Sequence, residues 1–146
     1  MSARHKARKA ALDLLFSAEI RGQNLADALA ELEQQASRQY ERQSILAYAT
    51  QLGRIVLNRQ SEIDALISEC LTDWTLERIP AVDRAILRVA TAELLEVPDV
   101  PTAVVIAEAG ELGSEFSTEQ SRSFLQGVLG TVAAHARGES SEPGEA

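Results

Sequence analysis

The stretch IPAVDRAILRVATAELLEVP, residues 79–98, decides the fold class of this 146-residue chain. Its apolar residues recur every three or four positions, which is the spacing of one face of an α-helix rather than the alternation of a strand. Pro80 suits the first turn, where a missing N–H does no harm, and Asp83 complements the helix dipole there. Pro98 ends the segment. The expected core face of this helix consists of Val82, Ile86, Val89, Ala90 and Leu94.

Six further segments carry apolar residues at helical spacing, and no stretch shows the alternation or the turn residues of a β-hairpin. We predict these helices over residues 3–20, 24–35, 44–57, 61–72 and 103–115 and from 117 onward. The sequence therefore predicts an all-α fold of about seven helices, in one domain over residues 1–137 with two packed sub-bundles at about 3–60 and 61–137. Residues 138–146 are rich in Gly, Ser, Glu and Pro, which predicts a disordered acidic tail.

Three local features add detail to this helical pattern. The segment from Asp73 to Ile79 is irregular, and we interpret Trp74 within it as a packing anchor rather than a ligand platform. Ser117 with Gln120 forms a candidate capping box. Glycine inside a helix costs about 1 kcal/mol against alanine, so paired glycines at helical spacing predict close helix crossings. Two such pairs occur, Gly110 with Gly113 and Gly127 with Gly130.

The composition supports this fold class and excludes several kinds of site. Ala and Leu dominate the 45% of apolar residues while aromatic residues make up 4%, which favours helices over strands. Cys70, the only cysteine, excludes an intramolecular disulfide and suits a reducing compartment. One cysteine and two distant histidines form no zinc cluster, so we expect no metal and no cofactor.

The pattern of apolar runs predicts a cytoplasmic protein. These runs are too short to span a membrane. Asp13 and Glu19 interrupt the apolar stretch near the N-terminus, so this stretch lacks the clean apolar region of a signal peptide. A mitochondrial transit peptide is harder to exclude from the pattern alone.

The net charge of −8 is unevenly distributed along the chain. The first nine residues carry four basic side chains and no acidic one, which leaves −12 on the other residues. A basic end on an acidic body can hold phosphates locally while the body repels them, which favours a defined nucleic-acid site. The alternative interpretation is an ordinary frayed N-terminus. The four basic residues are Arg4, Lys6, Arg8 and Lys9.

Basic and aromatic residues share one side of the first predicted helix. At about 100° per residue, one stripe of side chains lies away from the Ala/Leu core face and beside a basic row of Arg4 and Arg8. Phe16 near these cations suits single-stranded RNA, whose bases stack on rings while cations hold phosphates. The alternative is that Phe16 and Ile20 pack against another helix. The stripe consists of His5, Lys9, Leu12, Phe16 and Ile20.

A search for catalytic patterns finds no Gly-rich phosphate loop, nucleophile elbow or metal-ligand cluster. Glu93 and Glu108 lie in apolar surroundings and could form an acid pair, but hydrogen bonding between helices explains them better. We therefore expect a protein that is not an enzyme.

Four segments together resemble the NusB family, over about residues 3 to 136. ARKAALDLLF, residues 7–16, resembles the Arg-rich first helix of the family. IPAVDRAILRVA with the following Glu93-Leu94 resembles its central helix, and VPTAVVIAEAGEL, residues 100–112, resembles its sixth. Ser117 through Ser121, with FLQGVL at residues 124–129, resembles its seventh. The last three motifs, in this order and at this spacing, are specific together.

The resemblance implies a NusB-like helical fold and a non-catalytic adaptor. NusB-like proteins bind the boxA element of nascent RNA, notably in ribosomal RNA leaders, together with NusE, a small-subunit ribosomal protein. The pair joins a complex on RNA polymerase that opposes premature termination. Asp83 matches a position implicated in this complex, without assignment to RNA or to NusE. The candidate RNA-binding residues, from the resemblance and the stripe together, are Arg4, His5, Lys6, Arg8, Lys9, Phe16, Arg122, Ser123 and Phe124.

Two positions depart from the family pattern. Gln126 stands where Asn is usual before Gly-Val-Leu, and Gly113-Ser114 stands where a Lys often follows Glu-Leu. They put the contacts made there in doubt, but not the fold. Two other functions stay open: a helical protein-interaction module that binds no RNA, and the RNA-binding subunit of an RNA-modifying enzyme. The pattern does not decide whether the chain forms a homodimer.

Overall fold

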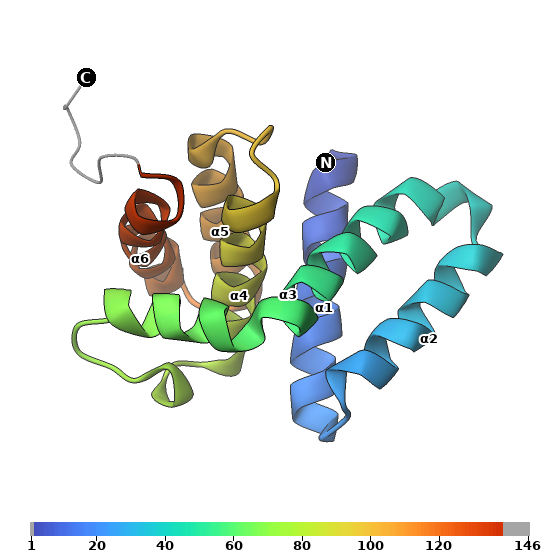
Figure 1. The fold of residues 1–146 in the computed structure, drawn as a ribbon, viewed down its shortest axis with the longest axis horizontal. Coiled ribbons are helices and arrows are strands. Elements are labelled where there is room, and N and C mark those ends of the chain that lie inside the picture. The colour runs from blue at the N-terminus through green and yellow to red at the C-terminus, as the bar shows by residue number, and fades with distance from the viewer. Residues whose placement is uncertain (1, 139–146) are drawn as a thin grey trace. The chain divides into compact units, whose positions relative to one another are not determined.

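The computed structural model describes residues 2–138, and helices joined by short turns and loops make up this part of the chain (Figure 1). It contains six α-helices and two short 3₁₀ helices and has no strand, which confirms the predicted all-α class. None of the helices in this part is long and apolar enough to cross a membrane. The elements are α1 (Ala3–Arg21), α2 (Leu25–Arg38), η1 (Tyr40–Arg42), α3 (Gln43–Cys70), η2 (Leu76–Arg78), α4 (Ala81–Glu96), α5 (Thr102–Phe116) and α6 (Glu119–Arg137).

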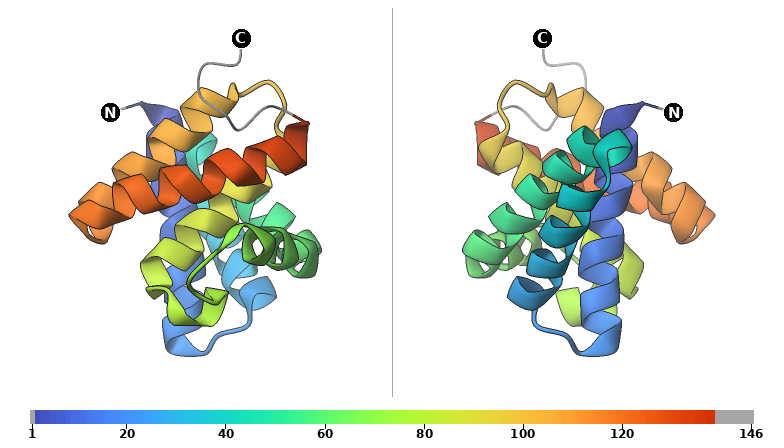
Figure 2. Two further views of the ribbon diagram at one scale, coloured as in Figure 1. Left: turned by 90° about the vertical axis from the view of Figure 1, so that its left-hand side faces the viewer. Right: turned by 90° about the vertical axis from the view of Figure 1, so that its right-hand side faces the viewer.

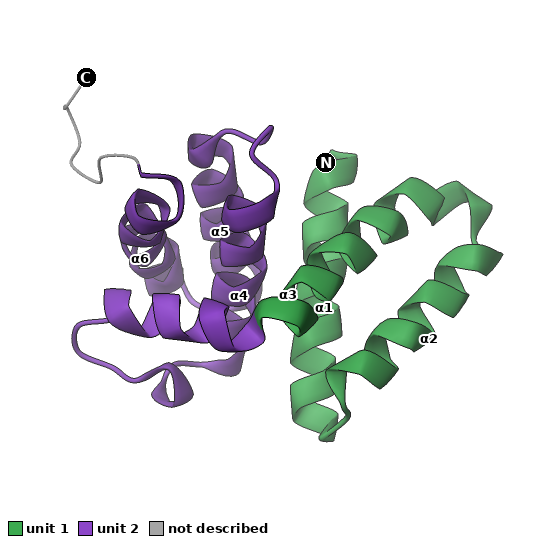
Figure 3. Cartoon of the chain, in the orientation of Figure 1, with its two compact units in different colours: residues 1–59 green, residues 60–146 purple. Residues whose placement is uncertain are grey.

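The helix count is six rather than about seven because the third and fourth predicted helices are joined in α3. Arg59, where the break was predicted, has non-helical backbone angles (φ −125°, ψ 24°) and kinks this helix. The chain divides into two compact units at the same place, one ending at Arg59 and one beginning at Gln60 (Figure 3). Of the predicted acidic tail, residues 139–146 lie outside the described residues, and Gly138 ends α6 in the left-handed conformation (φ 65°).

The first unit is built on α1 and α2, which lie side by side (Figure 2, right). A short turn joins them: Gly22 (φ 64°) closes α1 in a left-handed conformation that glycine adopts without strain. Asn24 then begins α2, because its side chain accepts a hydrogen bond from the Ala26 N–H. These two caps place the end of α1 and the start of α2 next to residues 20 and 24, where the predicted helices end and begin. The largest fully buried side chains of this unit are Leu29, Leu46 and Leu52.

The second unit is centred on α4, which packs against both α5 and α6. Nearly every side chain from Ala85 to Leu94 is buried, so this helix has no broad solvent face. α5 and α6 lie side by side along most of their length (Figure 2, left). A Cβ atom added to Gly113 would lie 2.5 Å from Leu125 Cδ1 and 3.1 Å from Ser121 Cβ, so the absence of a side chain permits this approach.

The glycine prediction is thus right for one pair and wrong for the other. Gly110 lies against the side chain of Gln126, in the same contact between α5 and α6 as Gly113. Gly127 and Gly130 have nothing within 4 Å of the position that a Cβ would occupy. Glycine spacing reports that a close approach is sterically allowed, but not that a neighbour occupies the space.

Two arginines hold the non-helical segments of the second unit in place. Arg84 donates from Nη1 to the carbonyl oxygens of Leu76 and Ile79 at 3.1 and 3.0 Å, and so holds the η2 segment. Arg137 donates to carbonyl oxygens at the end of α4 and in the turn that follows, Leu94 at 2.9 Å, Val97 at 3.0 Å and Val100 at 2.7 Å. Both guanidinium groups satisfy carbonyls that helix ends leave without intrahelical partners.

Candidate functional site

The N-terminal turn of α1 presents two of the predicted RNA-binding cations. Ser2 begins the helix, since its Oγ accepts a hydrogen bond of 3.0 Å from the His5 N–H. Arg4 and Lys6 are exposed. The Arg4 guanidinium lies 3.7 Å from the centroid of the buried Tyr48 ring, a cation–π contact that fixes the side chain while it stays exposed. The sequence did not indicate this contact, because Tyr48 is 44 residues away along the chain.

His5 and Arg8 differ from the prediction, because both are only 4% exposed and both have interaction partners. Leu12, on the same stripe, is buried as well. The stripe, with His5 and Leu12, and the basic row beside it, with Arg8, were predicted to lie away from the core, so the predicted exposure of these three residues is wrong. α1 is covered on more than its Ala/Leu face, and a single helical period cannot indicate a second covered face.

The C-terminal half of the stripe is accessible. Lys9 is half-buried and forms an ion pair of 2.8 Å with Asp13, one turn along the helix. Phe16 is half-buried, and Ile20 is 64% exposed. The alternative in which both pack fully against another helix does not hold for Ile20. Phe16 retains a partly open face on α1, in the same unit as Arg4 and Lys6.

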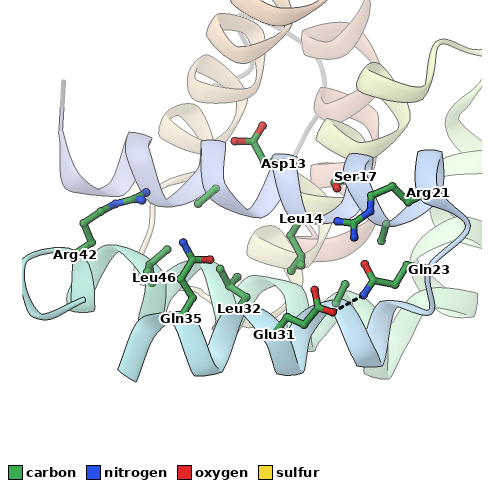
Figure 4. A pocket seen from close by; sticks show the side chains of 13 residues that line it. Asp13, Leu14, Ser17, Arg21, Gln23, Glu31, Leu32, Gln35, Arg42 and Leu46 are labelled. Carbon is green, nitrogen blue, oxygen red and sulfur yellow. Dashed lines mark hydrogen bonds between the residues drawn. The ribbon is translucent and has the colours of Figure 1, made fainter. Parts of the chain in front are cut away.

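A groove in the first unit lies beside α1 but contains none of the predicted site residues (Figure 4). Its volume is about 300 Å³. Leu14, Leu32 and Leu46 line it together with charged side chains, and Gln23 donates a 3.0 Å hydrogen bond to Glu31 across it. Arg21 and Arg42 point into the groove near its opposite ends. Apolar, amide and oppositely charged side chains alternate around this groove, so its lining does not indicate one class of ligand.

The start of α6 carries the other three predicted RNA-binding residues. Arg122 and Ser123 are exposed and Phe124 is half-buried. The capping box is shifted by one residue from the prediction: Thr118 Oγ1 accepts from the Ser121 N–H at 3.2 Å, and Ser121 Oγ accepts from the Thr118 N–H at 3.3 Å. The predicted Ser117–Gln120 box is wrong because Thr118, not Ser117, has the extended backbone of a capping residue (φ −128°, ψ 167°).

Asp83 lies beneath this capping box rather than on the surface. Asp83 is 3% exposed, and its carboxylate accepts from Ser121 Oγ at 3.1 Å and 3.0 Å, one distance to each oxygen. Ser121 therefore joins the first turn of α4 to the first turn of α6. The sequence indicated that Asp83 favours a helix N-terminus, but it did not indicate a partner 38 residues away.

These residues border a pocket of about 320 Å³ in the second unit. Trp74 lines it and is 58% exposed, so the interpretation of Trp74 as a packing anchor is wrong. Trp74 precedes η2, whose carbonyl oxygens Arg84 holds, and its side chain does not enter the core. The lining residues are Trp74, Arg78, Ile79, Pro80, Asp83, Thr118, Gln120, Ser121 and Phe124.

The two departures from the family pattern have different settings. Gln126 is half-buried and its amide lies where a Cβ on Gly110 would clash, 2.5 Å from that position. The short residue at 110 therefore makes room for the longer side chain at 126. Gly113 is buried and Ser114 is exposed on α5.

The sequence and the fold of this chain are both similar to those of known proteins. The model of the NusB family matches residues 5–134. The transcription antitermination protein NusB of Clavibacter sepedonicus is 47% identical over 134 residues, which are 92% of this chain and 98% of that protein. The structure of T. maritima NusB has a TM-score of 0.78 at 34% identity, over 91% of this chain and 92% of that one.

A third similar chain comes from a structure of the antitermination factors NusB and NusE in complex with dsRNA. Its TM-score is 0.78 at 24% identity, over 92% of this chain and 98% of that one. At this identity the likeness establishes a common fold.

Proposed function

The chain belongs to the NusB family, and we propose on that basis that it is a transcription antitermination factor. It binds boxA-type single-stranded RNA in nascent transcripts, notably ribosomal RNA leaders, together with NusE, and joins the complex on RNA polymerase that opposes premature termination. It acts in the cytoplasm and by binding rather than by catalysis. The observation that carries the proposal is the near-complete match to proteins of this name.

On α1, Arg4 and Lys6 make the phosphate contacts. Both are exposed, and the Tyr48 ring holds Arg4 in place, so less side-chain entropy is lost when Arg4 meets a phosphate. Lys9 and Phe16 extend this surface along the helix, with the partly open ring of Phe16 available for a base. His5 and Arg8 are buried, and their contribution is to support this turn rather than to touch RNA.

On α6, Arg122 and Ser123 provide exposed polar contacts and Phe124 a half-open ring. Each of these features suits unpaired RNA, since cations hold the backbone while rings stack bases. A few phosphate contacts alone give weak, salt-sensitive binding. NusE supplies additional surface, and tethering to the polymerase raises the effective concentration of each component.

NusE is a basic ribosomal protein, and the charge of this chain outside its N-terminus is strongly negative. This complementarity favours their association and accelerates encounter at low salt. Charge reversal of exposed acidic residues on the body should weaken NusE binding, and an unchanged affinity would count against this part of the proposal.

The test is fluorescence anisotropy with a labelled boxA-like RNA and a scrambled RNA of equal length, with and without NusE, across a salt series. We expect a preference for boxA that NusE strengthens. In the Arg4→Glu/Lys6→Glu variant, the affinity should fall and the slope of log K against log salt should become shallower by roughly 1.4, since each single-strand phosphate contact contributes about 0.7.

The matched control is Arg38→Glu, an exposed arginine in the last turn of α2. It should leave the salt slope unchanged. Equal and negligible binding of both RNAs, even with NusE present, would overturn the proposal and leave the helical protein-interaction module as the better account.

A further inference from the structure

We propose that the groove between α1 and α2 in the first unit is a docking site for a partner protein, which inserts a short helical segment with an apolar middle and acidic ends. The groove shares no residue with the predicted RNA-binding set, so this inference goes beyond the proposed function. The composition of the lining does not by itself indicate a class of ligand, but the pairing of its charged side chains does.

The floor of the groove is apolar, and a glycine makes room for it. Leu14 of α1 and Leu32 of α2 are half-buried and line the groove between its ends (Figure 4). A Cβ atom on Gly53 of α3 would lie 2.8 Å from Leu14 Cδ2, so the Leu14 side chain occupies space that only glycine leaves open. The groove stays hollow above it, with a volume of about 300 Å³, and offers apolar surface to a ligand.

The acidic side chains of the groove are already engaged. Asp13 forms its ion pair of 2.8 Å with Lys9, and Glu31 accepts the 3.0 Å hydrogen bond from Gln23. These two carboxylates therefore have less attraction left for a cationic ligand than unpaired carboxylates would have.

The two arginines of the groove are not engaged in this way. Within residues 2–138, neither the Arg21 nor the Arg42 side chain has a hydrogen-bond or ion-pair partner, and both residues are exposed. Their guanidinium groups point into the groove near its opposite ends (Figure 4). With Lys9 counted, three cations face two carboxylates, so the groove carries an excess of positive charge on a chain whose net charge is −8. An acidic ligand is attracted here and repelled by the rest of the chain.

The length and the surroundings of the groove suit a helical segment. α1 lines it from Ala10 to Arg21, which is about 16 Å at 1.5 Å per residue, or roughly three helical turns. An extended peptide would need a sheet edge for its backbone N–H and C=O groups, and the described part of the chain has no strand. A helix satisfies its own backbone, places its apolar face on the leucines and brings an acidic side chain to each arginine.

The same lining disfavours a nucleic acid as the ligand. Among the described residues that line the groove, none carries an aromatic ring, so an unpaired base has no platform for stacking. The carboxylates of Asp13 and Glu31 lie between the two arginines along the groove and would repel a run of phosphates (Figure 4). A peptide with its negative charges confined to its ends avoids this repulsion.

The test is fluorescence anisotropy with a labelled synthetic peptide of about twelve residues, which has glutamates at both ends and leucine and alanine between them. A peptide with glutamine in place of every glutamate is the comparison. We expect the full chain to bind the acidic peptide saturably and roughly 3- to 10-fold more tightly than the glutamine peptide, because two surface ion pairs are gained. The difference should shrink as salt is added.

Two variants test the ends and the floor of the groove separately. Arg21→Gln/Arg42→Gln removes both end charges, so it should bind the two peptides equally. Leu32→Ser removes apolar surface and should weaken both peptides by about tenfold without changing their ratio. The matched control is Arg38→Gln, an exposed arginine of α2 outside the lining, which should change neither affinity. Circular dichroism checks the fold of each variant, and boxA binding with NusE should be unchanged in all of them.

Equal affinity of the full chain for the two peptides, or no binding of either, would overturn the proposal. An oligouridine of similar length that binds the full chain but not Arg21→Gln/Arg42→Gln would overturn it and assign the groove to RNA. Peptide binding that appears only after deletion of residues 139–146 would also overturn it, since the acidic end of the chain itself would then be the occupant. Loss of boxA binding beside intact peptide binding would count against the proposed function alone.

Discussion

Arg88 and Asp64 form a two-pronged ion pair in the second unit, with Nε 2.8 Å from Oδ1 and Nη2 3.0 Å from Oδ2. It joins the part of α3 beyond the kink to α4. The side chains are only 17% and 28% exposed, so solvent screens the pair less than a surface pair. The planar guanidinium matches both carboxylate oxygens at once, which is the strongest geometry for such a contact.

We predict that Arg88→Met and Asp64→Asn each lower the free energy of unfolding by about 1–3 kcal/mol, because each leaves a partly buried charged partner unpaired. The double variant should lose less than the sum of the two, which urea unfolding of all four proteins would measure as a coupling energy. The Lys9–Asp13 pair, 42% and 57% exposed, is the comparison, with an expected coupling of about 0.5 kcal/mol or less. Equal coupling energies for the two pairs would contradict this account.

Arg137→Lys should be destabilising although it conserves the charge. A lysine ammonium cannot reach the spread of carbonyl oxygens that the Arg137 guanidinium binds, from Leu94 to Val100. We expect a loss of about 2 kcal/mol, seen as a fall in Tm of several degrees by calorimetry. The same substitution at exposed Arg21 should leave Tm within a degree or so. A wild-type Tm for Arg137→Lys would mean that water replaces these bonds without cost.

Alanine at two glycines of the second unit should change stability in opposite directions. Gly113→Ala places a methyl group against the fully buried Leu125 and against Ser121, so we expect a loss of about 1–3 kcal/mol. Gly127→Ala meets nothing within 4 Å and should gain about 1 kcal/mol from helix propensity. Chemical denaturation of the pair measures both. A gain at both positions would show that α5 and α6 separate easily.

Cys70 should react slowly with alkylating agents in the folded protein. Burial raises the pKa of its thiol, and the negative charge of Glu69 raises it further. The thiolate is the reactive form, so the rate should stay below that of free cysteine near neutral pH and rise only above the ordinary thiol range. Because the folded state holds this proton more tightly, the contribution to stability is complete at neutral pH and is lost as pH rises through the raised pKa.

Mass spectrometry after timed iodoacetamide treatment checks the rate. Glu69→Gln should speed the reaction modestly, since it removes the smaller of the two causes and leaves the burial. Full modification of the native protein within the time that free cysteine needs would contradict the prediction.

Local chemistry made the helices predictable. The periodic pattern from Val82 to Leu94 needed no tertiary information, and the turn at Gly22 and Asn24 follows from backbone preferences of those residues. The joined α3 was less accessible, because only Arg59 leaves the helical region and no Pro or Gly marks it.

The candidate site depended more on contacts distant in sequence. The exposure of Arg4 and Lys6 was predictable from charge, but the burial of Arg8 was not, since a buried arginine is rare unless it has partners. The pairing of Asp83 with Ser121 and the exposure of Trp74 arise from how α4, α6 and the η2 segment meet. The spacing of apolar residues within one helix does not indicate which residues of other helices it will contact.

The place of Arg137 has a practical consequence for engineering this chain. The side chain that closes the end of α4 and the turn after it belongs to the last residue of α6, directly before Gly138. A C-terminal truncation that removes Arg137 as well as Gly138 would therefore remove all five N–H donors of this guanidinium. The turn from Leu94 to Val100 would then lose its hydrogen bonds to the end of α6. A fusion partner, purification tag or cross-linker should therefore be attached after residue 138, where it leaves the hydrogen bonds of Arg137 intact.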